Sequence, residues 1–180
     1  MRAARWIKNG CIVLVLAAAL HVLVVWLTPR VITGVFLRRA AAQDGYNQVV
    51  LPPLPTDTSR AVVKPSPDLL YALCIYDIRS GPVRISAKPS EGYWSIALYG
   101  SNSDNFFKLN DREVQGDHVE LILSDAREAG DLRARHPDAI QVHPTSTVGL
   151  MLTRSLVLDP DNVKPVIDAR SSTRCEPLKD

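Results

Sequence analysis

A few residues carry side chains that could hold a metal ion. His118 and Glu120 are two positions apart, so in a strand both side chains lie on one face, a spacing that metal sites in β-barrels use. His136 and His143 could add ligands, yet each precedes a proline in a predicted loop. Solvated surface residues explain this pattern better than a metal site does, so we expect no metal and no cofactor.

The chain lacks the sequence patterns of covalent and phosphate chemistry. No G-x-S-x-G turn presents a serine nucleophile, and Cys74 lies within an apolar run. Gly100 and Gly116 are isolated, whereas a phosphate-binding loop needs several glycines close together. These patterns favour a role other than catalysis, although they leave an enzyme open.

Polar and aromatic residues among the apolar segments could instead line a ligand pocket. Arg154 stands out, because a charge in an otherwise apolar strand needs a carboxylate partner or a place on the surface. The alternative is structural: Trp94 belongs to the core, the tyrosines lie at a sheet edge, and Asp77 accepts hydrogen bonds in a turn. The candidate pocket residues are Tyr71, Asp77, Trp94 and Arg154, with Tyr99 as a neighbour.

Alternating apolar and polar residues predict the strands that would position these side chains. In Pro82–Lys88 every second residue is apolar, as in a half-buried strand. Tyr93–Tyr99 and Phe106–Leu109 flank a run of turn-forming residues and predict a hairpin. The other predicted strands are His118–Ser124, Val148–Leu158 and Leu69–Ile78, the last of which could also be a short helix. This spacing predicts a mainly β domain, a jelly-roll-like fold or a sandwich.

Three segments have a different character. Asp125–Ala134 is charged and predicts a loop or a short surface helix, and Asp161–Ala169 predicts a short helix with Asp159 or Asp161 as its cap. Five of the thirteen prolines lie from Pro52 to Pro67. This proline-rich segment predicts an extended, semi-rigid spacer, part of which could lie as an edge against the domain.

An apolar run near the N-terminus predicts a transmembrane helix. Gly10–Leu27 contains His21 as its single polar residue, and at 1.5 Å per residue it spans about 27 Å, close to the hydrocarbon thickness of a bilayer. Trp6 and Trp26 lie near its two ends, where indole rings favour the interface. The run is long for a cleaved signal peptide, and no small-residue cleavage site follows it closely. We therefore expect an uncleaved signal-anchor that ends at Pro29.

The charges divide the chain into two parts. Six of the 21 basic residues precede the first acidic residue, Asp44, and the remaining 15 face 19 acidic residues. A domain with this balance offers no basic surface for nucleic acid. Basic residues flank the apolar run on both sides, so the positive-inside rule only slightly favours an N-terminus in the cytoplasm. We therefore expect a single-pass protein of the inner (cytoplasmic) membrane with a periplasmic domain, in contact with the lipid bilayer.

The three cysteines leave one question open. Cys11 lies in the apolar run, where it acts as a small hydrophobic residue. Cys74 and Cys175 could form a disulfide if the domain reaches an oxidising compartment, but their sequence positions do not show whether they meet in space.

Several short motifs occur in an order that resembles a known family. Lys64–Tyr71 reads KPSPDLLY, Tyr76–Val83 reads YDIRSGPV and Gly92–Ile96 reads GYWSI. Asp104–Phe107 follows, and then Pro144-Thr145 with Arg154. This series is similar to the bacterial DUF 1254 family, a domain of unknown function, and the resemblance runs from about Lys64 to Leu178.

The resemblance implies a jelly-roll-like β domain and a frequent companion, a protein of the DUF 1214 family. It also implies that members with an N-terminal helix belong to the bacterial envelope. We thus expect a basic flank at 1–9, a signal-anchor at 10–28, a juxtamembrane and proline-rich linker at 29–63, and the β domain at 64–178. The function we expect is an interaction or assembly module working with a DUF 1214-type partner. The alternative is an enzyme or small-ligand-binding domain whose site that partner completes.

Overall fold

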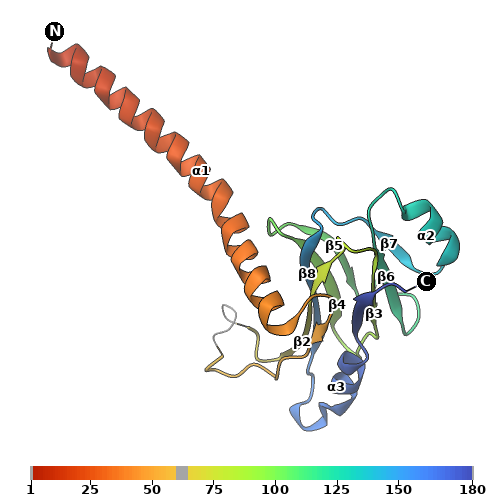
Figure 1. The fold of residues 1–180 in the computed structure, drawn as a ribbon. Helices are drawn as coiled ribbons and strands as arrows, with labels where there is room; N and C mark the ends of the chain where they lie inside the picture. Colours follow the sequence, from red (N-terminus) through yellow and green to blue (C-terminus); the bar gives the residue numbers. More distant parts are fainter. Residues whose placement is uncertain (1, 60–64, 180) are drawn as a thin grey trace.

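The N-terminal helix α1 spans Arg2–Asp44 and projects away from a β-rich domain (Figure 1). These elements belong to a computed structural model that describes residues 2–59 and 65–179. Lys64, where we expected the domain to begin, lies outside the described residues. Part of α1 is long and apolar enough to cross a membrane, with a mean hydropathy of 2.7 over its most apolar window, none of which is buried.

Helix α1 does not end at Pro29, as we expected, but continues through it. A proline inside a helix removes one backbone hydrogen bond and crowds the preceding turn. The lost bond is the one to the Val25 oxygen. The two neighbouring carbonyls accept side-chain hydrogen bonds at 2.7 Å, that of Val24 from the Thr28 hydroxyl and that of Trp26 from the Arg30 guanidinium.

Helix α1 ends at a glycine and turns directly into the domain. Gly45 has a φ of +87°, and its N–H donates to the Ala41 oxygen, as in a left-handed helix cap. The last turns of α1 then pack on the domain, because Leu37 and Ala41 form a buried cluster with Ile75. The helix therefore meets the domain without a spacer.

The first sheet, called sheet A below, is antiparallel throughout. Its strands lie in the order β1-β2-β8-β4-β5. Their bounds are Val49–Val50 for β1, Leu69–Asp77 for β2, Val148–Leu156 for β8, Trp94–Gly100 for β4 and Asn105–Asn110 for β5. The segment at Leu69 is thus a strand and not a helix, and the predicted β4–β5 hairpin is confirmed.

The second sheet, sheet B, has the order β7-β6-β3-β9. Its strands are Ile140–Val142 (β7), Val119–Leu123 (β6), Val83–Ala87 (β3) and Arg174–Pro177 (β9). Strands β6 and β7 are parallel, while the other pairs are antiparallel. Sequence reasoning missed β7 and β9, because each is too short to show an alternating pattern.

One hydrophobic core fills the space between the two sheets. Sheet A contributes Tyr76, Ile96 and Met151, and sheet B contributes Ile85 and Leu121, all of them fully buried. The alternation read from the sequence groups Ile85 with its inward neighbours in β3 and Ile96 with those in β4, as the structure has them. The chain is therefore a two-sheet β domain behind a long apolar helix.

Three short helical segments complete the domain. Helix α2 spans Ala129–Arg135 and buries Leu132, and helix α3 spans Lys164–Ser171. The 3-10 turn η1, Pro160–Asn162, precedes α3, and the Asp159 side chain caps it by accepting a hydrogen bond from the Asp161 N–H. Of the loop or short surface helix expected over Asp125–Ala134, the structure has the helix, α2. A helix near Asp161–Ala169 is also present, but it begins later than expected, and the expected cap is wrong: Asp159 caps η1, whereas the N-cap residue of α3, Val163, makes no side-chain hydrogen bond.

The proline-rich segment does not separate the anchor from the domain. It follows β1, which pairs with β2 at Val49–Cys74 and Val50–Leu73. The described parts of the segment therefore follow one strand of sheet A and precede another, while residues 60–64 lie outside the described residues. Sequence reasoning missed β1, which has too little pattern to be recognised. The alternative expectation, that part of the segment lies against the domain, agrees with a hydrogen bond from Arg170 of α3 to the Pro52 oxygen.

Candidate functional site

Two residues of the predicted pocket adjoin each other on the outer face of sheet A. Tyr71 of β2 lies directly opposite Arg154 of β8, and Ser95 of β4 lies opposite Arg154 on the other side. The Arg154 guanidinium also donates to the Tyr99 hydroxyl, with 3.2 Å between Nη2 and Oη. Tyr71, Tyr99 and Arg154 are half-buried and form what we call the Arg154 cluster.

The Arg154 cluster holds a positive charge without a matching carboxylate. Among the described residues, no carboxylate lies within ion-pair distance of Arg154, and its hydrogen-bond partner is the Tyr99 phenol. Burial raises the pKa of Tyr99, but interactions with Arg154 and Asn105 outweigh it and leave the pKa below its usual value. The cluster is thus suited to an anionic group, which would add acceptors for the guanidinium.

The other two predicted pocket residues lie elsewhere. Trp94 is 2% exposed and belongs to the core between the sheets, on the face opposite to Arg154. Asp77 lies at the far end of β2, opposite Val148, and its carboxylate accepts hydrogen bonds from Arg79 at 2.6–3.0 Å. The structure therefore brings Tyr71 and Arg154 together and places Trp94 and Asp77 in separate structural roles.

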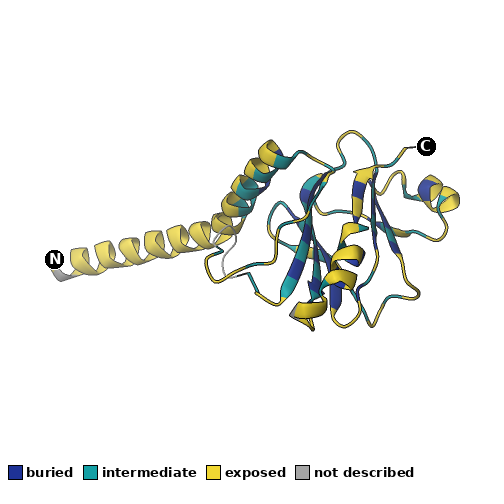
Figure 2. Cartoon of the chain, turned by 90° about the horizontal axis from the view of Figure 1, so that it is seen from below, coloured by how far each residue is buried: buried dark blue, intermediate teal, exposed yellow. Residues whose placement is uncertain are grey.

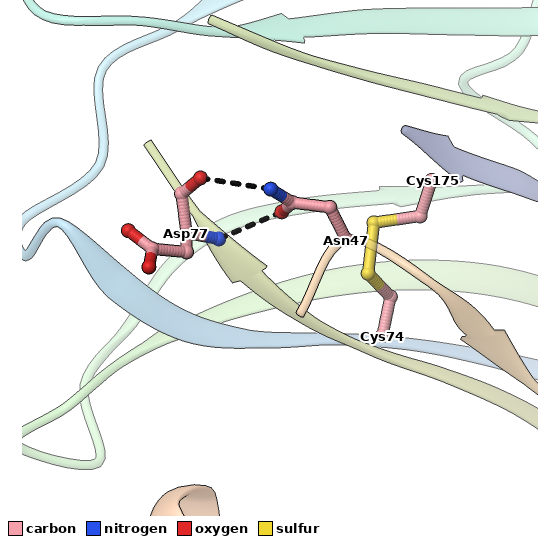
Figure 3. Close-up of a disulfide and its surroundings, with 4 residues drawn as sticks. All are labelled: Asn47, Cys74, Asp77 and Cys175. Atoms are coloured by element: carbon pink, nitrogen blue, oxygen red, sulfur yellow. Dashed lines mark hydrogen bonds between the residues drawn. A yellow bond between two sulfur atoms is a disulfide. The ribbon is translucent and has the colours of Figure 1, made fainter. Parts of the chain in front are cut away.

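Asp77 belongs to the junction between α1 and the domain. The Asn47 side-chain amide donates to the backbone carbonyl oxygen of Asp77 at 3.0 Å and accepts from the backbone N–H of Asp77 at 2.8 Å (Figure 3). The Asn47 N–H also donates to the Ile75 oxygen. Hydrogen bonding from Arg79 lowers the pKa of Asp77. Asn47 has a φ of +55°, a conformation that asparagine tolerates, so this clamp had a weak local signal that sequence reasoning missed.

A disulfide lies close to this junction. Cys74 of β2 and Cys175 of β9 are bonded, with their Cα atoms 6.4 Å apart (Figure 3). Because β2 belongs to sheet A and β9 to sheet B, the bond joins the two sheets across the core. Cys11 is free and exposed on α1.

A second basic side chain connects the proline-rich loop with sheet A. Arg170 of α3 donates to the Pro52 oxygen at 2.7 Å and to the Tyr71 oxygen at 3.4 Å. Burial lowers the pKa of Arg170. The Ser66 N–H donates to the Tyr71 hydroxyl at 3.0 Å, so the loop also reaches the edge of the Arg154 cluster.

The histidines weighed as metal ligands do not form a metal site in the described part of the chain. No three His, Cys, Asp or Glu side chains gather there in a group that could hold an ion. The Glu120 carboxylate lies 3.8 Å from Arg84, and the His143 ring interacts with the Ser124 oxygen at 3.2 Å. These residues therefore have surface and packing roles.

A shallow hollow of about 240 Å³ lies between α2 and the end of the chain. This volume is below the range of about 300–1,000 Å³ typical of small-molecule sites. Half of its lining residues are charged, and the lining comprises Pro82, Glu128, Asp131, Leu132, Arg135 and Leu178. The hollow is separate from the Arg154 cluster and has no convergent catalytic groups.

Comparisons with known proteins give a family and a fold. The structure resembles the VPA0106 protein from Vibrio parahaemolyticus, with a TM-score of 0.65 and 13% identity over 86% of this chain. It also resembles a putative uncharacterized protein from Burkholderia cenocepacia, with a TM-score of 0.53 and 17% identity over 85% of this chain. The chain covers 36% and 40% of these two structures, so it spans well under half of each.

Among curated proteins, none matches the sequence. A family match covers residues 46–177, and thus starts near the end of α1 and not at Lys64. It includes β1, the proline-rich loop, both sheets and the disulfide. The chain belongs to the DUF1254 family, whose description is "protein of unknown function".

Proposed function

We propose that this protein is an interaction or assembly module anchored in the inner (cytoplasmic) membrane of a bacterium, with a jelly-roll-like domain in the periplasm. Helix α1 acts as an uncleaved, single-pass signal-anchor. The observation that carries the proposal is the direct packing of α1 on sheet A beside the half-buried Arg154 cluster. This arrangement leaves an aromatic and cationic face at a fixed place next to the anchor.

The apolar part of α1 supports the anchoring. Its large side chains are exposed along the whole run, including Leu14 at 71% and Leu20 at 61%. Exposed apolar surface of this size is unfavourable in water and favourable in lipid. A lipid bilayer is therefore the partner that this segment fits.

The disulfide supports the periplasmic side. Structural disulfides persist in oxidising compartments such as the periplasm and are rare in the cytoplasm. Cys74 and Cys175 are both buried, as structural cysteines are. Alkaline phosphatase fused after Asp180 should be active in cells, and a green fluorescent protein fused there should stay dark. The reverse pattern would contradict a periplasmic domain.

The Arg154 cluster supports a protein partner. Tyrosine and arginine are enriched among the residues that dominate binding energy at interfaces. Tyr71, Tyr99 and Arg154 are half-buried on one face, and a partner carboxylate would pair with the guanidinium. We expect this partner to be a DUF 1214-family protein, as the resemblance to the family implies.

Co-purification tests this assignment. The full chain is co-expressed with a tagged DUF 1214 protein from the same genome and purified in detergent. Arg154→Glu should reduce the retained chain at least tenfold, because it reverses the charge at the interface. Arg133→Glu, on the exposed surface of α2, serves as the control and should leave retention unchanged.

Two outcomes would contradict the assignment of a DUF 1214-family protein as the partner. One is equal retention of the Arg154→Glu and unchanged chains, and the other is no retention of either. Non-reducing electrophoresis of each sample reports the Cys74–Cys175 bond and shows that the variant domain is folded.

A small anionic ligand is the second candidate function, either for binding alone or for an enzyme whose site the partner completes. Arg154 without a carboxylate, together with the lowered pKa of Tyr99, favours this alternative. Millimolar inorganic phosphate or acetate should then raise the melting temperature, Tm, of the full chain but not of Arg154→Ala. A rise of equal size in both proteins would contradict a site at Arg154.

A further inference from the structure

The turns of α1 that follow Pro29 have two different faces. One face packs on sheet A through Phe36, Leu37 and Ala41. The opposite face carries Val31, Ile32 and Val35, whose side chains are 58%, 64% and 42% exposed. Figure 2 shows buried and half-buried residues on α1 only in these last turns, on the side toward the domain.

On the exposed face of α1, apolar residues are followed by basic residues at one point. It is apolar up to Val35, and then Arg38 and Arg39 follow, both exposed. On the side of α1 that faces the domain, the first basic residue, Arg30, comes about two turns earlier. There the Arg30 guanidinium lies 4.0 Å above the Trp26 ring, an aromatic and cationic pair of the kind found at membrane interfaces.

We infer that the hydrocarbon of the bilayer reaches Val35 on the face of α1 away from the domain, and that Arg38 and Arg39 contact lipid phosphates there. The partner of this face is thus a lipid surface with anionic headgroups. Arginine is suited to this position, because it attracts anionic lipids and binds phosphate oxygens through several donors. The inference rests on the proposed membrane anchoring and specifies where the surface lies.

The length of the exposed apolar run fits a tilted helix. From Ile12 to Val35 the helix rises about 36 Å at 1.5 Å per residue, compared with a hydrocarbon thickness of about 30 Å. A tilt of about 30° reconciles the two lengths and lies within the usual range of transmembrane helices. A tilted helix leaves the bilayer obliquely, so its lower side stays in lipid about one turn longer than its upper side. The tilt thus accounts for about half of the offset between Arg30 and Arg38.

The domain packs on the upper side in this arrangement. Leu37 is less exposed than Val31 and Val35 because it packs on Ile75 of sheet A. The Asn47 clamp on Asp77 fixes the end of α1 to β2, so the domain stays close to the headgroups. The bilayer thus contacts one side of this part of α1, and the domain contacts the other side.

Spin labels at three positions on one helix face test the inference. Val24, Val35 and Ala42 are all exposed and lie on the same side of α1. Each is replaced by cysteine in the full chain carrying Cys11→Ser, with the disulfide intact, and labelled with a nitroxide in liposomes of phosphatidylcholine and phosphatidylglycerol. We expect oxygen to relax the labels at 24 and 35 more than a water-soluble nickel chelate does, and the reverse at 42.

Each result has a distinct meaning. A label at 24 in lipid with a label at 35 in water overturns this inference and leaves the anchor in place. A label at 24 in water contradicts the anchoring itself. A label at 35 that neither reagent reaches shows that another protein segment covers this face, and it overturns the lipid assignment.

A charge reversal tests the headgroup contact. With the label at 35, Arg39→Glu should raise accessibility to the nickel chelate at least twofold in liposomes that contain phosphatidylglycerol, because phosphate then repels the side chain. The effect should be smaller in phosphatidylcholine alone. Arg133→Glu on α2 changes the net charge equally and should have no effect. An unchanged accessibility with Arg39→Glu would overturn the headgroup contact.

Discussion

At the scale of the residue, the Asn47 side chain makes the hydrogen bonds to β2 that a neighbouring strand would otherwise make. Its side chain bonds both backbone groups of Asp77, and its own N–H bonds the Ile75 oxygen. These bonds satisfy the end of β2 beyond the reach of β1, which begins only at Val49 and pairs with Cys74 and Leu73. The positive φ of Asn47 lets the chain leave α1 and enter this position within three residues.

Asn47→Ala should destabilise the protein by about 1–3 kcal/mol, because two backbone groups of Asp77 lose their partners and alanine tolerates the positive φ poorly. Chemical denaturation of the detergent-solubilised chain measures the change. Arg79→Ala, a largely exposed ion-pair partner at the same junction, should cost far less. Equal losses for the two variants would show that the clamp contributes nothing beyond the ion pair.

The Asp77 carboxylate should make the stability of the folded protein depend on pH. Its pKa in the folded protein is lowered, chiefly by the hydrogen bond from Arg79, so the folded state favours the ionised form. This stabilisation is present above the ordinary pKa of about 3.9 and is lost as the pH falls through the folded value.

A series of Tm measurements from pH 7 to pH 3 tests this dependence. Asp77→Asn should melt lower than the unchanged protein at pH 7, and the gap should begin to narrow below about pH 4. Asp117→Asn, at an exposed turn position, should follow the unchanged protein at every pH. A gap that stays constant across the series would argue against ionisation as the cause.

At the scale of the element, α1 serves two environments along its length. Its run from Gly10 to Leu27 is exposed and apolar, and its last turns pack on Ile75, Val148 and Leu150 of sheet A. Because the helix continues through Pro29, the two parts are one element and not an anchor with a flexible linker. The position of the domain therefore follows from the helix.

Leu37→Ala should loosen this contact, because it removes the buried side chain at its centre, where Leu37 is 4% exposed. Truncation of a buried leucine typically costs about 2–5 kcal/mol, so we expect amide exchange over residues 36–44 to rise at least tenfold. Val35→Ala, on the opposite face of the helix, is the control. Similar exchange in both variants would mean that α1 and sheet A do not stabilise each other.

At the scale of the whole molecule, the two sheets are held by one core and one disulfide. The bond joins Cys74 and Cys175, which are 101 positions apart, and so closes most of the domain into a loop. It also fixes β9, a four-residue edge strand near the C-terminus. A short edge strand buries little surface, so a covalent link is a large part of its attachment.

Replacing both cysteines by alanine should lower the stability of the domain by about 2–5 kcal/mol, because the unfolded chain regains the entropy that the cross-link removes. Denaturation of the detergent-solubilised protein, with and without a reducing agent, provides the measurement. Cys11→Ala should change neither the stability nor its response to reductant, since this cysteine is free. If the double variant retained full stability, the core alone would hold the sheets together.

Local sequence patterns determined the elements of this protein. The apolar run predicted a helix. Alternation, a continuous apolar run and turn-forming residues together predicted six of the strands, and alternation assigned the inward residues of β3 and β4. Such patterns are local, because helix and strand periods repeat over neighbouring residues. The order of the short motifs indicated the DUF1254 family, which the match over residues 46–177 bears out.

Tertiary structure alone decided which of these elements meet. The pairing of Cys74 with Cys175, the contact of Arg154 with Tyr99 and the packing of Leu37 on Ile75 each join residues far apart in the chain. The order of the strands and the packing of α1 bring such residues together. A local sequence pattern does not contain this information, because it involves only neighbouring residues. For the same reason the sequence misplaced the end of α1 at Pro29 and missed β1, since tertiary contacts hold both.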